Sequence, residues 1–407
     1  MSQLPALIER VPSRESSSTV DISPIIRIQK ALFREAAALG ASDIHIEPGR
    51  VCTRVRCRVH GALRQITELP RWLHENLIVR IKVLAHLDVS ERRVPQDGHI
   101  DAEATGTDDA RVSTVPTRWG EKVVIRMLKR ATNAMSLVEI GFPKPFEDTL
   151  RAWTRRSQGI LFVVGPTGSG KTTTLYGLIH EIRNEPINIV TIEDPIEYEV
   201  DGITQIQTNE RSGLTFARVL RAILRQDPDV ILVGEIRDSE TAKTAVHASM
   251  TGHLVLSTLH ANDSVAALFR LAELGIERSV AASVLLGVVA QRLVRLNCPA
   301  CAEADTPPPL YMDVLGIPRS EAGRFRHSRG CADCGFSGTR GRAGLFELLE
   351  MTSQLQEFCI EGNENRIRRA AIEAGMLSLK QQAAAMAIAG AISIHEAYRF
   401  GCSGEAL

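Results

Sequence analysis

The residues with the clearest chemistry form a glycine-rich loop between an apolar run and a helix. The segment GPTGSGKTTT starts at Gly165, directly after ILFVV, and matches the pattern GxxxxGK[ST] in full. The backbone N–H groups of such a loop surround phosphates, its lysine reaches the β- and γ-phosphates, and its Ser/Thr hydroxyl coordinates Mg²⁺. The helix that follows adds the positive end of its dipole. The sequence therefore predicts a nucleoside triphosphate site made by Gly165, Pro166, Thr167, Gly168, Ser169, Gly170, Lys171, Thr172 and Thr173.

Carboxylates follow two of the apolar runs downstream of this loop. INIVTIEDPIEY carries Glu193 at the end of its run, and DVILVGEIRD carries Glu235 one residue beyond its run. Ligands of open α/β sheets bind at the carboxyl ends of the strands. Hydrolysis of a triphosphate needs one group for the attacking water and another for the Mg²⁺ shell. We assign Glu193 to the water, and Glu235 and Thr172 to Mg²⁺, although the two glutamates could be exchanged.

Two histidines flank the next apolar run, in the segment TGHLVLSTLHAND. His260 follows the run, together with the hydroxyls of Ser257 and Thr258, and His253 precedes it. A polar group at the carboxyl end of this strand would lie near the γ-phosphate and respond to its presence. We therefore expect a catalytic role for His260. For His253, at the opposite end, a structural or interdomain role is as good an interpretation.

The elements that must position these residues follow from the hydrophobic pattern. GILFVVG, INIVTIE, DVILVGE and HLVLSTL are short apolar runs that alternate with helical segments, which indicates a parallel sheet covered by helices on both faces. Upstream, DIHIEP and RVCTRVRCRVHGAL alternate polar and apolar residues like half-buried strands. They follow an amphipathic helix with one apolar face, formed by Ile25, Ile28, Leu32 and Ala36. We expect a flexible tail (1–20), an N-terminal α+β domain (21–140) and an α/β domain (141–407) ending in helices from residue 350.

The composition of the 407-residue chain excludes several classes of protein. Lys+Arg and Asp+Glu both number 48, and this zero net charge disfavours nucleic-acid binding. No apolar run reaches the about 20 residues needed to cross a bilayer, and the N-terminus lacks the pattern of a signal peptide. We expect a cytoplasmic protein, whose cysteines remain reduced.

Four of the eight cysteines form two CxxC pairs, with 29 residues between Cys301 and Cys331. Four thiolates suit a tetrahedral structural Zn²⁺, and each pair can present both sulfurs from one short turn. The gap is longer than the about 15–20 residues of compact zinc modules. We predict a zinc-binding insert at residues 298–335, with a vestigial or disulfide-prone loop as the alternative. The ligands would be Cys298, Cys301, Cys331 and Cys334.

Taken together and in order, these motifs resemble those of the bacterial secretion ATPases of type II secretion and type IV pilus assembly, the GspE/PilB type. The family's phosphate loop, Asp box, glutamate-type Walker B and His box correspond to GPTGSGKTT, TIEDPIEY, LRQDPDVILVGEIRDSETA and TGHLVLSTLHAND. GASDIHIEP, ERRVPQDGHI and VPTRWGEKVVIRML extend the resemblance over residues from about 20 to 400. The resemblance implies a RecA-like P-loop ATPase core with a smaller, PAS-like N-terminal domain and the zinc insert.

The resemblance also implies a function. Such proteins are homohexamers, peripheral on the cytoplasmic face of the inner membrane, that hydrolyse ATP with Mg²⁺ to move membrane-embedded platform proteins during protein export or pilus assembly. Arg111 and Arg126 match positions that reach the phosphates, so we expect them to clamp ATP from the N-terminal domain as an arginine finger does.

Two other functions compete with the motor. One is a zinc-containing nucleic-acid translocase of the RecA-like class, which the neutral charge and the lack of aromatic-rich basic stretches disfavour. The other is a nucleotide switch that does not hydrolyse ATP, which the intact carboxylates and Lys171 disfavour.

Overall fold

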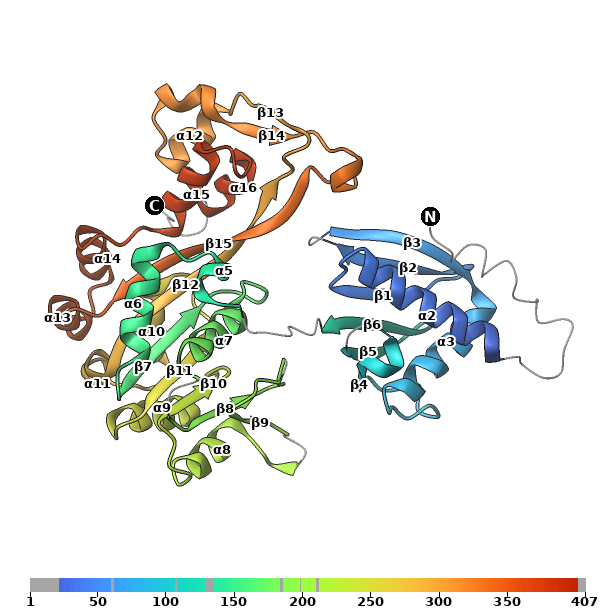
Figure 1. Cartoon of the computed structure of the whole chain (residues 1–407), viewed down its shortest axis with the longest axis horizontal. Coiled ribbons are helices and arrows are strands. Elements are labelled where there is room, and N and C mark those ends of the chain that lie inside the picture. The colour runs from blue at the N-terminus through green and yellow to red at the C-terminus, as the bar shows by residue number, and fades with distance from the viewer. Residues whose placement is uncertain are drawn as a thin grey trace, which may run out of the picture. The chain divides into compact units, whose positions relative to one another are not determined.

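The computed structural model (Figure 1) describes residues 22–59, 62–106, 109–128, 135–183, 186–197, 199–209 and 212–401. The expected tail at residues 1–20 lies outside them. The chain divides into two compact units, Met1–Thr132 and Asn133–Leu407. Within the described ranges, no helix combines the length and the apolar character that crossing a membrane requires.

The N-terminal unit is a six-stranded antiparallel sheet in the order β3-β2-β1-β6-β5-β4. The predicted apolar face of its first helix is confirmed, because Ile25, Ile28, Leu32 and Ala36 are all buried. This helix packs against α3, which in turn covers β2, β3, β4 and β6. The elements are α2 (Ile22–Ala38), β1 (Asp43–Pro48), β2 (Cys52–Val59), β3 (Ala62–Pro70), α3 (Arg71–Leu84), β4 (Gln96–Ile100), α4 (Ala102–Thr105), β5 (Asp109–Thr117) and β6 (Gly120–Leu128).

The C-terminal unit is built on a seven-stranded sheet in the order β15-β12-β7-β11-β10-β8-β9. All neighbouring strands are parallel except β15, which runs antiparallel to β12. The strands are β7 (Gly159–Val164), β8 (Ile189–Glu193), β9 (Thr204–Gln207), β10 (Val230–Val233), β11 (Leu254–Leu259), β12 (Leu285–Asn297) and β15 (Thr339–Glu350). The predicted α/β class and parallel sheet are confirmed.

Helices cover both faces of this sheet. Successive residues of β7 alternate between two apolar cores, with Phe162 in one and Val163 in the other, and the whole strand is buried. The core around Val163 includes side chains of α5 (Leu137–Ile140), α6 (Lys144–Thr154) and α7 (Lys171–Ile182). The core around Phe162 includes side chains of α8 (Phe216–Ile223), α9 (Ser239–Met250), α10 (Ser264–Glu273) and α11 (Arg278–Val284).

Beyond the other strands of the sheet, β12 and β15 continue toward a small module that contains the four paired cysteines (Figure 1). Its elements are β13 (Ala302–Ala304), α12 (Pro309–Leu315), η2 (Arg319–Arg324), β14 (Arg326–Ser328) and η3 (Ala332–Cys334). The helices expected after residue 350 are present as α13 (Ser353–Glu361), α14 (Glu364–Glu373), α15 (Leu379–Ile388) and α16 (Ile394–Gly401).

A buried ion pair in the N-terminal unit gives a testable prediction about its stability. Lys82 of α3 lies 2.6 Å from Glu121 of β6, and the side chains are 1% and 8% exposed. Glu121→Ala leaves a buried ammonium without its counter-charge, so we expect a loss of about 3–5 kcal/mol. Glu75→Ala is the control, because that carboxylate is 70% exposed and its ion pair with Arg92 should contribute at most about 1 kcal/mol.

Urea unfolding followed by tryptophan fluorescence would measure both variants, since Trp72 and Trp119 belong to this unit. Equal midpoints for the Glu121 and Glu75 variants would show that the buried pair contributes no more than an exposed one.

Candidate active site and tetracysteine cluster

The predicted phosphate loop connects the carboxyl end of β7 to the start of α7. Gly168 and Gly170 adopt φ values of 79° and 90°, a left-handed conformation that side chains disfavour. The Ser169 hydroxyl is buried and has no hydrogen-bond partner among the residues that the structure describes. Lys171 Nζ donates to the carbonyls of Gly165 and Pro166 at 2.9 and 3.0 Å. A glycine cradle with an unpaired buried hydroxyl and a lysine at its mouth fits a magnesium–nucleotide complex.

The strand order decides how far each predicted residue lies from this loop. β11, which ends just before His260, adjoins β7; β10, which ends before Glu235, comes next; and β8, which ends in Glu193, follows. With neighbouring strands about 4.8 Å apart, β10 lies about 10 Å and β8 about 14 Å from the strand that carries the loop. His260 and Glu235 are therefore nearer to the loop than Glu193 is.

Glu235 and His260 meet beside the phosphate loop. His260 Nε2 lies 3.6 Å from Glu235 Oε2, and Arg237 pairs with the other carboxylate oxygen. His260 also lines an open hollow of about 460 Å³ together with Gly165 and Pro166. Burial lowers the pKa of Lys171, Glu235 opposes this shift, and repulsion from Arg292 adds to it. The structure thus places His260 against Glu235 and beside the first residues of the loop, with Glu235 in electrostatic range of Lys171.

Glu193 occupies a different environment. It is 3% exposed. Thr191 Oγ1 donates to it at 2.6 Å, Gln205 Nε2 donates at 3.2 Å, and the Tyr176 hydroxyl donates as well. These donors come from β8, from the edge strand β9 and from α7. The Glu193 carboxylate therefore links the helix that follows the phosphate loop to the β8–β9 edge of the sheet.

The remaining polar residues of the histidine segment have structural contacts. The buried hydroxyls of Ser257 and Thr258 donate to the carbonyls of Val233 and Gly234 at 2.7 and 2.8 Å, and so hold the backbone that leads to Glu235. His253 Nδ1 lies 3.0 Å from the Ala248 carbonyl oxygen, where α9 turns into β11. The structural interpretation of His253 is therefore the better supported one.

Arg111 and Arg126 belong to the N-terminal unit, where they lie directly opposite each other on β5 and β6. Arg126 Nε is 3.2 Å from the carboxylate of Asp43, which also faces Arg58 at 3.4 Å. His99 of β4 lies opposite Arg111 and extends this row of basic residues across the sheet.

Two residues beside the phosphate loop were not predicted. Gln291 of β12 accepts a hydrogen bond from Thr174 Oγ1 at 2.6 Å and is 2% exposed. A Cβ atom at Gly170 would lie 2.8 Å from the side-chain amide nitrogen of Gln291. Close packing is therefore a second reason, besides its positive φ, why this position is a glycine. Arg292 follows on the same strand. The signal in the sequence was the polar pair QR directly after the apolar run GVVA.

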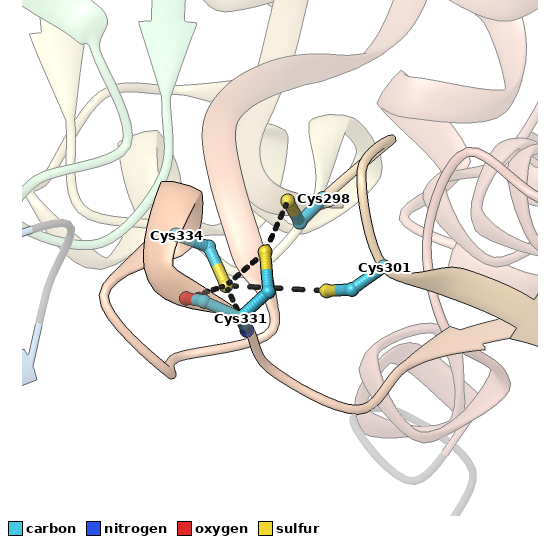
Figure 2. A group of neighbouring side chains, drawn as sticks. All are labelled: Cys298, Cys301, Cys331 and Cys334. Carbon is cyan, nitrogen blue, oxygen red and sulfur yellow. Dashed lines mark hydrogen bonds between the residues drawn. The ribbon is translucent and has the colours of Figure 1, made fainter.

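The four paired cysteines converge, as Figure 2 shows. Their Sγ–Sγ distances are 3.9 Å for Cys298–Cys331, 4.0 Å for Cys301–Cys334 and 3.8 Å for Cys331–Cys334. A tetrahedral zinc site with Zn–S bonds of about 2.3 Å has sulfurs about 3.8 Å apart. The amides of Cys331 and Gly338 donate to Cys334 Sγ and lower the pKa of this thiol to about 6, whereas burial raises the pKa of the Cys301 thiol to about 11. It is the geometry of the four sulfurs that indicates a metal. The donor set and spacing therefore fit zinc, and all four thiols are free.

The chain is similar to known proteins over most of its length. A family model described as "Type II/IV secretion system protein" matches residues 18–399. The chain is 43% identical over 399 residues to "Type II secretion system protein E" of Pseudomonas aeruginosa, a match covering 97% of this chain and 79% of that one. It is 47% identical over 354 residues to "Type II secretion system ATPase E" of Vibrio cholerae, covering 86% and 70%. It is 40% identical over 392 residues to "Type IV pilus assembly ATPase PilB" of Thermus thermophilus, covering 95% and 44%.

Among the solved structures that match nearly the whole chain are those of PilT and DotB. The pilus retraction motor PilT with bound ADP superimposes with a TM-score of 0.66 at 25% identity, covering 92% of this chain and 97% of that one. The ATPase DotB of Legionella pneumophila gives a TM-score of 0.67 at 21% identity, covering 96% and 97%, a likeness of fold alone.

Proposed function

Because the chain belongs to the type II/IV secretion system protein family and is an ATPase, we propose that it works as a homohexameric motor on the cytoplasmic face of the inner membrane. ATP hydrolysis would move a membrane-embedded assembly platform during protein export or pilus assembly. The relatives are secretion and pilus ATPases, which supports this function over nucleic-acid translocation. The observation that carries the proposal is the Glu235–His260 pair beside the phosphate loop, with Glu235 in electrostatic range of Lys171.

For the chemistry, we propose that Glu235 takes the role on the attacking water that the sequence assigned to Glu193, instead of its own predicted role on Mg²⁺, and that Glu193 acts on neither. Glu235 faces His260 and lies in the electrostatic range of Lys171, so it is the group that orients the attacking water. Glu193 is enclosed by three donors and positions α7 instead. Lys171 and the loop amides hold the phosphates, and the exposed Thr172 hydroxyl at the start of α7 coordinates Mg²⁺. Mg²⁺, when bound, neutralises charge on the phosphates.

Two further parts of the proposal extend beyond the phosphate loop. Arg111 and Arg126 would act on the phosphates from the N-terminal domain of the same chain, and their adjacent positions on β5 and β6 suit a paired action. The four paired cysteines would hold one structural Zn²⁺, which their sulfur spacing supports.

The first prediction separates the two glutamates. Glu235→Gln should lower ATP turnover by ~10²–10⁴ and leave ATP affinity nearly unchanged, because it removes the acid/base group without removing a phosphate contact. Glu193→Gln should lower turnover less and reduce stability by about 1–3 kcal/mol, because an amide cannot accept from all three donors. Steady-state kinetics, nucleotide binding and thermal unfolding would measure these effects.

Lys171→Ala serves as the control in this series, since it removes a phosphate contact and should weaken nucleotide binding itself. If Glu193→Gln abolishes turnover while Glu235→Gln turns over ATP normally, the assignment first made from the sequence is the correct one.

The second prediction concerns the metal. Elemental analysis of the purified protein should find about one zinc per chain, and replacing both Cys298 and Cys331 by Ser should remove it, because two thiolates cannot hold the ion alone. Cys359→Ser is the matched control, since Cys359 is also buried in the C-terminal unit but lies outside the cluster. A metal-free protein that is folded and active would refute the zinc site.

The third prediction is that Arg126 acts on the ATP site of its own chain and not on that of a neighbouring subunit. Lys171→Ala subunits are mixed with Arg126→Ala subunits, each of which we expect to be inactive alone. If Arg126 serves the site of its own chain, every subunit of the mixed ring carries a defective site and activity stays low. A mixture of Lys171→Ala with wild-type subunits gives the reference. Substantial ATPase activity in the doubly mutant mixture would mean that Arg126 reaches a neighbouring subunit's site.

A further inference from the structure

Arg292 lies at the side of the phosphate loop, although no motif predicted it. β12 pairs with β7 through Ala290 and Val164, so the two residues that follow Ala290 lie beside the start of the loop. A Cβ atom at Gly165 would stand 2.5 Å from the Gln291 carbonyl oxygen and 3.0 Å from Nη1 of Arg292. The guanidinium therefore packs directly against the first residue of the loop.

The same guanidinium reaches the loop that carries His260. Arg292 Nη2 donates to the Asn262 carbonyl at 2.6 Å, and Nη1 donates to the Gln291 carbonyl at 3.1 Å. Asn262 is two residues beyond His260, whose ring faces Glu235. One planar group thus connects the backbone of β12 to the backbone of the His260 loop, beside Gly165.

The residues after Asn262 are held from two other elements. Asp263 caps α10 through the Ala266 amide at 2.8 Å and pairs with Arg368 of α14 at 3.0 Å. Glu347 of β15 accepts from both the amide and the hydroxyl of Ser264, at 2.9 and 2.5 Å. The downstream side of the His260 loop is therefore fixed, and Arg292 supplies the contact on the side of the phosphate loop.

The charges around Arg292 agree with this position. Burial lowers the pKa of Arg292, while Asp263 and Glu347 oppose the shift, and Arg292 in turn contributes to the lowered pKa of Lys171. Although it is half buried, the guanidinium stays charged, and its hydrogen bonds to Gln291 and Asn262 both end on backbone carbonyls.

We propose that Arg292 is a positioning residue of the ATPase site, which holds the His260 loop against the phosphate loop and so sets the geometry of the His260–Glu235 pair. This inference rests on the ATPase function proposed above. It predicts that losing Arg292 impairs turnover through His260, not through nucleotide affinity. A lysine at this position keeps the charge, but its one ammonium group lacks the planar fork whose two separate nitrogens reach the Gln291 and Asn262 carbonyls.

The test uses the full-length protein and the variant Arg292→Gln. Its kcat should fall by ~10²-fold, the loss that a misplacement of about 1 Å in an active site can cause, while its affinity for a fluorescent ATP analogue stays within about threefold. Arg292→Lys should also lose turnover, which covers the case that the Gln variant fails to fold. Arg295→Gln is the matched control, because Arg295 is on the same strand and pairs with Glu396 at 2.8 Å. It should keep the wild-type kcat.

A double-mutant cycle with His260→Gln distinguishes positioning from an independent role. If Arg292 acts through His260, then adding Arg292→Gln to His260→Gln should change kcat by less than about threefold, because the two residues work as one unit. If the losses of kcat of the two single variants instead multiply in the double variant, the proposal is wrong. It is also wrong if Arg292→Gln loses as much nucleotide affinity as kcat.

Hydrogen exchange gives a readout that does not depend on activity. Amides of residues 260–266 should exchange faster in Arg292→Gln than in the wild type, and at the wild-type rate in Arg295→Gln. Unchanged exchange in Arg292→Gln would refute the tether. A wild-type protein without ATPase activity would instead refute the proposed function, and the exchange result would still decide whether Arg292 holds the loop.

Discussion

The position of β7 between β12 and β11 is the constraint on which the candidate site depends. A loop that leaves the carboxyl end of a central parallel strand is bounded by whatever the two neighbouring strands present at the same edge. Here these are Gln291 and Arg292 on one side and His260 on the other. The hydrogen bond from Thr174 to Gln291 fixes the first turn of α7 to the same wall. Residues 165 and 170 of the loop are glycines because a side chain at either position would collide with Gln291.

Two glutamates with similar sequence contexts take different parts in this arrangement. Each follows a buried strand of the same sheet, yet the Glu193 carboxylate is satisfied by three donors and the Glu235 carboxylate faces a histidine and an arginine near Lys171. The three hydrogen bonds fix the Glu193 carboxylate to α7, β8 and β9, whereas the Glu235 carboxylate lies against residues of the candidate site. In the proposed mechanism, strand order therefore gives different roles to two residues that sequence alone could not tell apart.

The positions of the phosphate loop, the two carboxylates and His260 at the ends of strands could be predicted because each is marked by local signals: glycine spacing, or a polar residue at the end of an apolar run. The roles assigned to them stay predictions. The parallel sheet and the apolar face of α2 followed from periodicity in the same way. The contacts that define the roles could not be predicted, since their partners are remote in sequence. Thr174 and Gln291 are 117 residues apart, and Arg126 and Asp43 are 83 apart. Which buried carboxylate finds donors is decided by packing, which no short pattern records.

The placement of β12 beside β7 also bears on how the molecule is made. The chain leaves the ribosome from its N-terminus, and the N-terminal unit, which has its own apolar core, precedes the strand that carries the phosphate loop. Residues 165–173 are synthesised more than one hundred residues before Gln291 and Arg292, and until then one side of β7 has no partner strand. A nascent chain therefore displays the complete nucleotide-binding motif while its binding site is still unformed. The ATP site is therefore complete only after β12 has paired with β7. Pairings between strands so distant in sequence are slow steps of folding.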